Sequence, residues 1–295
     1  MLLGIAFIVV VVGPLLLALA GWMRARSEPP AQMRWDFRLM ALSTLLYVLA
    51  FNLVFFVQEL FLVLPKAFTP GLQPTLFHNN HLWQGEHALA SLFQGTGALA
   101  TVLLGIGCLL LLRGRTLTSM SVRLLLVWLA YCGIFMALPQ VVVGALSTGS
   151  DVGMAMEYFR LSPEVKTVCA LLALAAIPFA ARACARQVLR LAPEPALATA
   201  RARSRFVLQA ATIPALLAIV LIIPFRVPRE WLEVMFLPLV VVAAGIPWIQ
   251  AGAWRLQAVD PVVSRPAVSL VYPLVATLAL LLVFQRVLRP GVDFF

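Results

Sequence analysis

The stretch LMALSTLLYVLAFNLVFFVQELFLVL, residues 39–64, decides the fold class of this chain. It is apolar along most of its length, and it exceeds the roughly 20 residues that a helix needs to cross the hydrocarbon core of a bilayer. Asn52, Gln58 and Glu59 interrupt its second half. The stretch therefore predicts a transmembrane helix that carries a few polar groups toward one end.

The rest of the chain repeats this pattern. The whole chain is 62% hydrophobic and 12% charged, whereas a soluble domain is about 45–50% apolar and about 25% charged. We predict an all-α integral membrane protein, a single polytopic domain over residues 1–295 with about eight transmembrane helices. The expected spans are residues 2–22, 39–64, 88–112, 124–147, 167–183, 206–225, 232–254 and 267–285. The first span begins without a basic stretch and has no clear cleavage site, so we expect a retained anchor and not a signal peptide.

The basic residues predict an orientation. Alternate loops and span ends hold 15 Lys and Arg on one side and seven on the other. Cytoplasmic loops carry the excess of basic residues, so both termini and the loop at 65–88 are expected outside. The protein would lie in a bacterial cytoplasmic (inner) membrane. The net charge of +10 then meets anionic lipid headgroups, and nucleic acid is not an expected partner.

The loop after the second span holds all three histidines of the chain, in His78-Asn-Asn-His81-Leu-Trp-Gln-Gly-Glu-His87. Three prolines and a glycine precede Thr75 and exclude a long helix there. Thr75 can cap a short helix that places His78 and His81 three residues apart, on one face. His87 would open the third span, after a turn that Gly85 permits.

Three imidazoles at one membrane face predict a metal site. Three protein ligands and one open position are the arrangement of a catalytic zinc centre, so we expect His78, His81 and His87 to bind Zn or another transition metal ion. Glu59 or Glu86 would be the fourth ligand or a general base, and Gln94 a polar orienting group. Gln58, Asn79 and Asn80 are further candidates to orient the imidazoles. The His-x2-His-x5-His spacing matches no established metal motif.

These residues favour a metal-dependent membrane enzyme that performs hydrolysis or group transfer on a lipid or a membrane-associated peptide. The alternative is a non-catalytic membrane protein, a transporter or a subunit that docks a membrane-protein partner, in which the histidine loop is structural. A carrier would need ionisable groups deep in several spans, and Glu59 is nearly alone there. No nucleotide-binding loop, serine elbow or His-Glu-x-x-His helix occurs.

Three other regions could contribute to the site. Small and polar residues recur at helical spacing along the third span, from His87 to Gly105, and predict a helix buried inside the bundle. The loop 148–166 is either a lid or a solvated connector. Arg226 and Arg229 either hold an anionic headgroup or anchor the chain at the interface.

Overall fold

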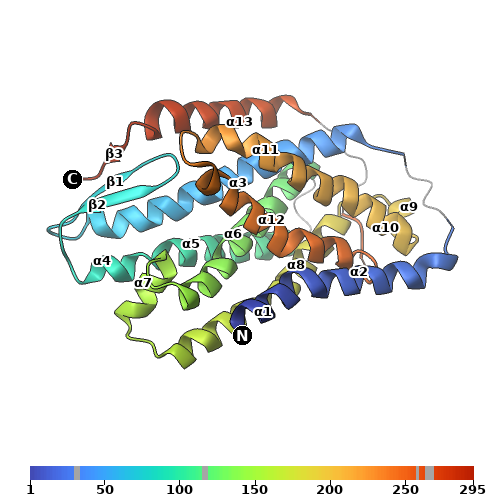
Figure 1. Cartoon of the computed structure of the whole chain (residues 1–295). Helices are drawn as coiled ribbons and strands as arrows, with labels where there is room; N and C mark the ends of the chain where they lie inside the picture. The colour runs from blue at the N-terminus through green and yellow to red at the C-terminus, as the bar shows by residue number, and fades with distance from the viewer. Residues whose placement is uncertain (30–33, 115–118, 257–258, 263–268) are drawn as a thin grey trace.

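The computed structural model describes residues 1–29, 34–114, 119–256, 259–262 and 269–295. Within them, eight helices are long and apolar enough to cross a membrane, which confirms the predicted number of spans. The protein is thus a multi-pass integral membrane protein by the length and composition of its helices (Figure 1). The eight spans are Leu2–Ser27, Phe37–Ala67, Leu89–Arg113, Met120–Leu146, Pro163–Leu189, Ala200–Arg226, Trp231–Gly252 and Val271–Leu288.

Several spans consist of more than one element. The first contains α1 (Leu2–Phe7), η1 (Ile8–Val12), α2 (Gly13–Arg24) and η2 (Ala25–Ser27). The others are α3 (Phe37–Ala67), α4 (Leu89–Phe93) with α5 (Thr96–Arg113), α6 (Met120–Leu146), α8 (Pro163–Leu189), α10 (Ala200–Val207) with η3 (Leu208–Thr212) and α11 (Ile213–Arg226), α12 (Trp231–Gly252), and α13 (Val271–Val283) with η4 (Phe284–Leu288). Outside the spans lie β1 (Gln73–Leu76), β2 (His81–Gln84), α7 (Asp151–Tyr158), α9 (Glu194–Leu197) and β3 (Val292–Asp293).

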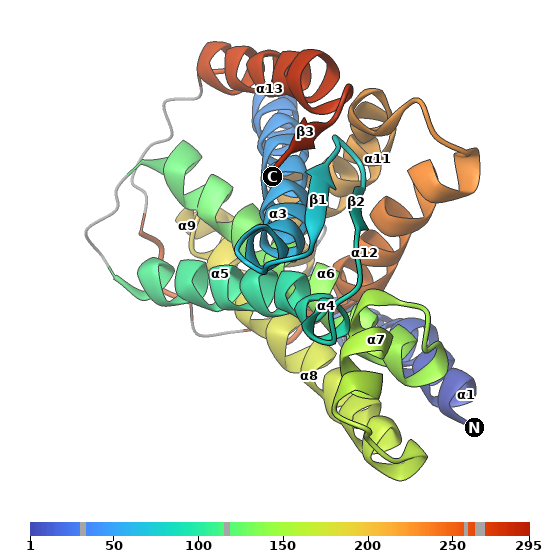
Figure 2. The same ribbon diagram turned by 90° about the vertical axis from the view of Figure 1, so that its left-hand side faces the viewer.

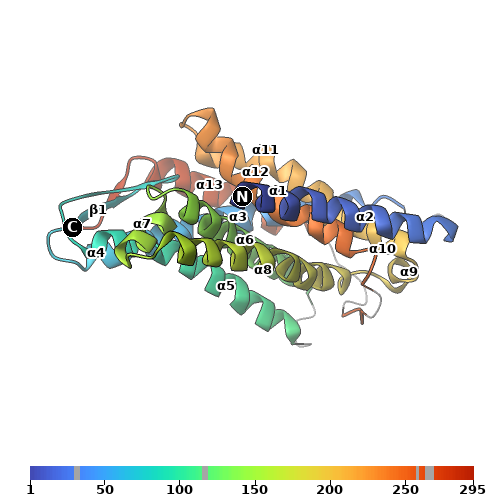
Figure 3. The same ribbon diagram turned by 60° about the horizontal axis from the view of Figure 1, so that its bottom comes forward.

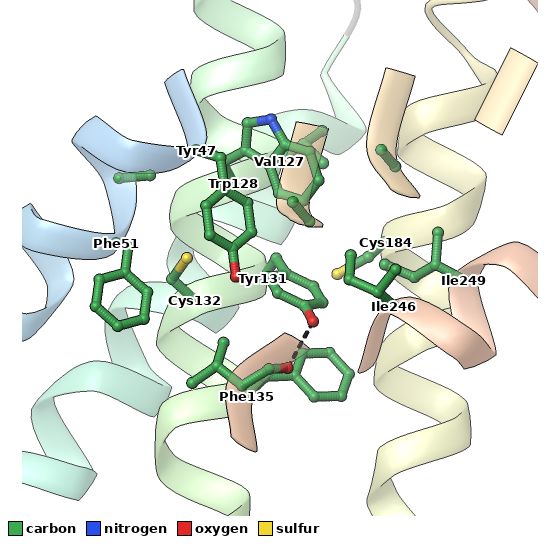
Figure 4. Close-up of a cluster of buried hydrophobic side chains, with 14 of the residues drawn as sticks. Tyr47, Phe51, Val127, Trp128, Tyr131, Cys132, Phe135, Cys184, Ile246 and Ile249 are labelled. Carbon is green, nitrogen blue, oxygen red and sulfur yellow. Dashed lines mark hydrogen bonds between the residues drawn. The ribbon is translucent and has the colours of Figure 1, made fainter. Parts of the chain in front are cut away.

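Helix α6 occupies the centre of the bundle. It packs against α3, α5, α8 and α12, which surround it in the end-on view of Figure 2. A buried aromatic cluster joins α3 to α6: the Tyr47 and Trp128 rings meet edge to face with centroids 4.8 Å apart. The Tyr131 hydroxyl donates to the Val241 carbonyl of α12 at 2.7 Å (Figure 4). Aromatic packing and this hydrogen bond thus hold α3 and α12 against α6.

The first and last spans are peripheral. η1 and α2 run along α12 at the edge of the bundle (Figure 3), where the Trp248 indole of α12 donates to the Val9 carbonyl of η1 at 2.9 Å. Apolar side chains on both spans, such as Leu15 and Leu278, are more than half exposed. Such surfaces are expected to face lipid.

The third span was predicted to be buried inside the bundle, and the structure shows that it is not. Its small residues do form a packing face: a Cβ on Gly97 would lie 2.9 Å from the Gln58 carbonyl oxygen of α3, and one on Gly105 would lie 2.9 Å from the Ala130 carbonyl oxygen of α6. The opposite face, with Leu99 and Leu103, is exposed. A single stripe of small residues supports close approach on one side only.

The histidine loop is a β-hairpin, which corrects the prediction of a short helix after Thr75. β1 pairs antiparallel with β2, with Leu76 opposite His81, and β3 near the C-terminus joins the other edge of β1 (Figure 2). The Phe77 amide donates to the Asn80 carbonyl at 2.8 Å, which closes the turn around His78 and Asn79. Asn-rich turn chemistry therefore outweighed helix formation here. The all-α prediction is right for the spans but misses this three-stranded sheet.

Candidate functional site

A buried polar network fastens the hairpin to the bundle. Nδ1 of His81 lies 2.8 Å from Oε2 of Glu59 on α3, and Nε2 lies 3.0 Å from Oε1 of Gln94 between α4 and α5. The Lys66 ammonium, two helical turns beyond Glu59, donates to the same Gln94 oxygen at 3.1 Å and to the Leu62 carbonyl at 2.7 Å. All four side chains are buried. We call Glu59, Lys66, His81 and Gln94 the hairpin network.

The hydrogen bonds assign the protons of His81. The Lys66 ammonium can only donate, so it fixes the carbonyl oxygen of Gln94 on its side, and the Gln94 amide nitrogen points instead to the Met154 sulfur at 4.0 Å. His81 Nε2 then faces an acceptor, and Nδ1 faces the Glu59 carboxylate. With Glu59 as a carboxylate, both nitrogens donate. In this arrangement neither ring nitrogen offers a lone pair to a metal ion.

Trp83 covers the hairpin network. Its ring is stacked with the His81 ring at a centroid distance of 5.9 Å, and the Lys66 ammonium lies 4.7 Å from the Trp83 ring centroid. A cation over an indole face is attracted by the ring quadrupole. The indole also keeps water from the charges, which strengthens their interactions.

Asp151 lies beside the hairpin network, at the start of α7. Its pKa is raised, first by burial and then by the negative charge of Glu59, while the positive charges of His81 and Lys66 oppose the shift. The Ser150 hydroxyl caps α7 by accepting from the Gly153 amide at 3.3 Å, which fixes the position of Asp151. This carboxyl therefore keeps its proton to a higher pH than an ordinary aspartate does.

A pocket of about 200 Å³ opens next to Asp151. Its walls are apolar side chains of α6 and α12, among them Phe135, Met136, Phe236 and Leu237. Its polar lining is Gln58, Gln140, Ser150 and Asp151, and the Gln140 amide donates to Gln58 Oε1 at 2.8 Å. An apolar cavity with a few convergent polar groups is the usual form of a small-molecule or acyl-chain site. Gln140 thus belongs to the wall of this pocket.

The structure does not bring the three predicted metal ligands together. Nε2 of His78 lies 3.1 Å from the Val227 carbonyl oxygen, beyond the turn of the hairpin. His87 is exposed, and its Nδ1 accepts from the Leu89 amide at 3.2 Å. Glu86 is exposed as well. Within the described residues, no group of three or more His, Cys, Asp or Glu side chains is placed to hold a metal ion. Of the predicted set, Glu59, His81 and Gln94 do meet.

Sequence reasoning missed Lys66 and underrated Asp151. Lys66 lies seven residues after Glu59, so the two share a face of α3, and it is one of only two lysines in the chain. That spacing was the available signal. Asp151 belongs to the loop 148–166 that was expected to be a lid or a connector, and no local pattern places it beside Glu59.

Comparisons with other proteins leave the site as the main guide to function. The chain matches no protein-family model, and neither curated proteins nor solved structures gave a match.

Proposed function

We propose that this protein is an integral-membrane enzyme that catalyses hydrolysis or group transfer on a lipid or a membrane-associated peptide. The observation that carries the proposal is Asp151, a carboxyl of raised pKa that lines an apolar pocket and lies beside a second carboxyl, Glu59. Pairs of carboxyl groups whose environments differ in this way commonly divide acid and base roles.

Each residue of the pair has a role. Asp151 exchanges a proton with the substrate or with an attacking water. Glu59 lies 2.8 Å from Nδ1 of His81, and its negative charge helps to raise the pKa of Asp151. His81, Gln94 and Lys66 position Glu59. The apolar walls of the pocket suit an acyl chain or an apolar peptide side chain, and a substrate would reach them along the bilayer.

The orientation predicted from the basic residues belongs to this proposal. With both termini outside, the 15 basic residues of the other side face the cytoplasm, as in a bacterial inner membrane. The hairpin and Asp151 then lie at the outer face. Impermeant thiol labelling of cysteines introduced at Gln84 and Ala198, in a background without native cysteines, tests this. Labelling only at Ala198 in intact cells would reverse the orientation.

A transition metal ion stays a proposal, with a narrower set of ligands. Glu59 and His81 are in contact, but His81 would have to release Glu59 or Gln94 to bind a metal through a ring nitrogen. Metal counting on protein purified without chelators tests this version. About one equivalent of zinc per chain, lost in His81→Ala but kept in His87→Ala, would support it.

A second candidate function follows from one observation: His81 is satisfied at both ring nitrogens. A fully satisfied buried network is also what a structural clamp requires. In that case the hairpin serves to dock a partner protein, and Asp151 has no chemical role.

One experiment separates enzyme from clamp. Purified protein is reconstituted with a total lipid and membrane-peptide extract of its host, and mass spectrometry follows which species are consumed. We expect conversion by the wild type and a loss of about 100-fold or more in Asp151→Asn and Glu59→Gln, the size of general acid–base effects. Glu157→Gln is the matched control, since Glu157 is exposed on the same helix. No conversion by the wild type, or equal conversion by wild type and Asp151→Asn, would reject the enzyme and favour the structural clamp.

A further inference from the structure

A second pocket lies on the other side of the hairpin. It has a volume of about 240 Å³ and is lined by Asn79, Asn80, Arg226, Arg229, Glu233 and Val234. The hairpin turn contributes one wall, and the end of α11 and the start of α12 contribute the other. The Asn79 amide donates to the Arg226 carbonyl at 2.9 Å, which joins the two walls.

Arg226 is buried without a full set of partners. Its side chain is 7% exposed, and one terminal nitrogen donates to the Glu233 carbonyl oxygen at 3.2 Å. Within the described residues, Nε and Nη1 have no hydrogen-bond partner. The guanidinium lies over the Phe55 ring, 4.7 Å from its centroid. A buried charge with unused donors is costly unless another group accepts hydrogen bonds from them.

The nearby acids do not supply the missing hydrogen-bond partners of Arg226. The Glu233 carboxylate is paired with Arg229 at 2.9 Å, and the Glu59 carboxylate receives a hydrogen bond from His81 at 2.8 Å. Glu59 attracts Arg226 through space, but no hydrogen bond joins them in the described structure. Nε and Nη1 of Arg226 therefore stay without a hydrogen-bond partner among the described residues, in a side chain that lines the pocket.

His78 lies in the same positively charged surroundings. Its Nδ1 is buried without a partner among the described residues. Its pKa is lowered, first by burial and then by the positive charges of Arg289, Arg229 and Arg226. Three arginines thus act on one imidazole at this place. An anion would relieve both the unused donors and the mutual repulsion.

We infer that this pocket binds a phosphate group, either on a lipid headgroup or on a soluble phosphate compound. Arg226 donates to the phosphoryl oxygens from inside, Arg229 from the rim, and the side-chain amides of Asn79 and Asn80 border the site. Guanidinium groups are well suited to phosphate because they are planar, always charged and weakly hydrated. The cavity volume of about 240 Å³ is large enough for a phosphate group. The inference does not depend on the proposed enzyme activity.

Native mass spectrometry of the full-length protein in detergent tests the lipid source, with phosphatidylglycerol as probe and diacylglycerol as the phosphate-free control. Calorimetric titration with inorganic phosphate, against chloride at equal ionic strength, tests the soluble source. Binding of phosphatidylglycerol alone assigns the pocket to a lipid, and binding of inorganic phosphate alone assigns it to a soluble ligand. Binding of neither probe overturns the inference.

Variants locate the binding in this pocket. Arg229→Gln and Arg226→Gln should each weaken it about tenfold or more, the loss of a charged hydrogen bond. Glu233→Gln removes the only acid among the described residues that line the pocket and frees Arg229, so it should tighten binding several-fold. A gain in affinity cannot result from misfolding of the variant. Arg286→Gln, an exposed arginine outside the pocket lining, is the control. Equal affinities in wild type, Arg229→Gln and Glu233→Gln would overturn the inference.

Discussion

The two sides of the hairpin differ in how their buried charges are satisfied. On one side, His81 donates from both nitrogens, to Glu59 at 2.8 Å and to Gln94 at 3.0 Å, and Trp83 covers the group. On the other side, Arg226 and His78 keep polar atoms that no group in the described structure reaches. Both sides use the same short hairpin, so the contrast comes from their partners.

The contrast separates polar groups that hold the fold from groups that await a ligand. A closed network rigidifies its surroundings, and here it fixes Glu59 next to Asp151. An open set of buried donors is expensive on its own and persists where function requires it. The two sides therefore predict different responses to the same kind of substitution.

The largest expected effect is on the closed side. His81→Ala leaves the buried Glu59 carboxylate without its donor, so we expect a loss of about 3–5 kcal/mol in the free energy of unfolding. His78→Ala removes one bond to a backbone carbonyl and should cost about 1 kcal/mol. His87→Ala, at an exposed position, should change stability by less than about 0.5 kcal/mol. Chemical unfolding in detergent ranks the three. Equal losses would mean that the histidines act as one unit.

The closed network can also be disturbed through packing alone. In Gly97→Ala the new Cβ would lie 2.8 Å from Leu62 Cγ and 2.9 Å from the Gln58 carbonyl oxygen. The substitution should push α5 from α3, draw Gln94 away from Lys66 and cost about 1–3 kcal/mol. Gly107→Ala is the matched control on the same helix, because nothing lies within 4 Å of its Cβ. A gain in helix propensity makes it neutral or slightly stabilising. The same melting temperature for both variants would show that α3 and α5 are not in close contact.

The smallest effect is a pH dependence of opposite sign on the two sides. The pKa of His78 is lowered in the fold, so the unfolded chain takes the proton first, and stability falls as pH drops below about 6.5. The pKa of Asp151 is raised, so its contribution is greatest at low pH and is lost as pH rises through that raised value. Unfolding measured from pH 4 to 8 for wild type, His78→Gln and Asp151→Asn checks both signs. Slopes that neither substitution changes would contradict them.

Hydrophobic patterning was sufficient for the spans and insufficient for their connections. Apolar runs such as residues 39–64 specify a membrane helix because lipid leaves the backbone no other partner. The third span was expected in the interior because its small-residue stripe was visible, while the exposed face with Leu99 and Leu103 looks the same in lipid as in a protein core. The hairpin was missed because an i, i+3 pair of histidines fits a helix and a turn equally well.

The candidate site was predicted in part. Glu59 was identified as an ionisable group in a span, and His81 and Gln94 as possible neighbours. The shared face of Glu59 and Lys66 follows from their spacing along α3, which the sequence alone contains. The place of Asp151 depends on how α7 packs against α6 and α4, an interaction with Glu59 across nearly a hundred residues that no local pattern encodes. The orphaned donors of Arg226 likewise arise only from packing.

The most direct test of the contrast between the two sides is a nitrogen NMR spectrum of protein labelled only at histidine, assigned with His78→Gln and His81→Gln. We predict that both ring nitrogens of His81 carry a proton, that His78 carries one proton, at Nε2, and that added zinc does not shift the three histidines together. Phosphate should shift the signals of His78 and leave those of His81 in place. A bare nitrogen on His81, or a common shift of all three histidines on adding zinc, would contradict this account.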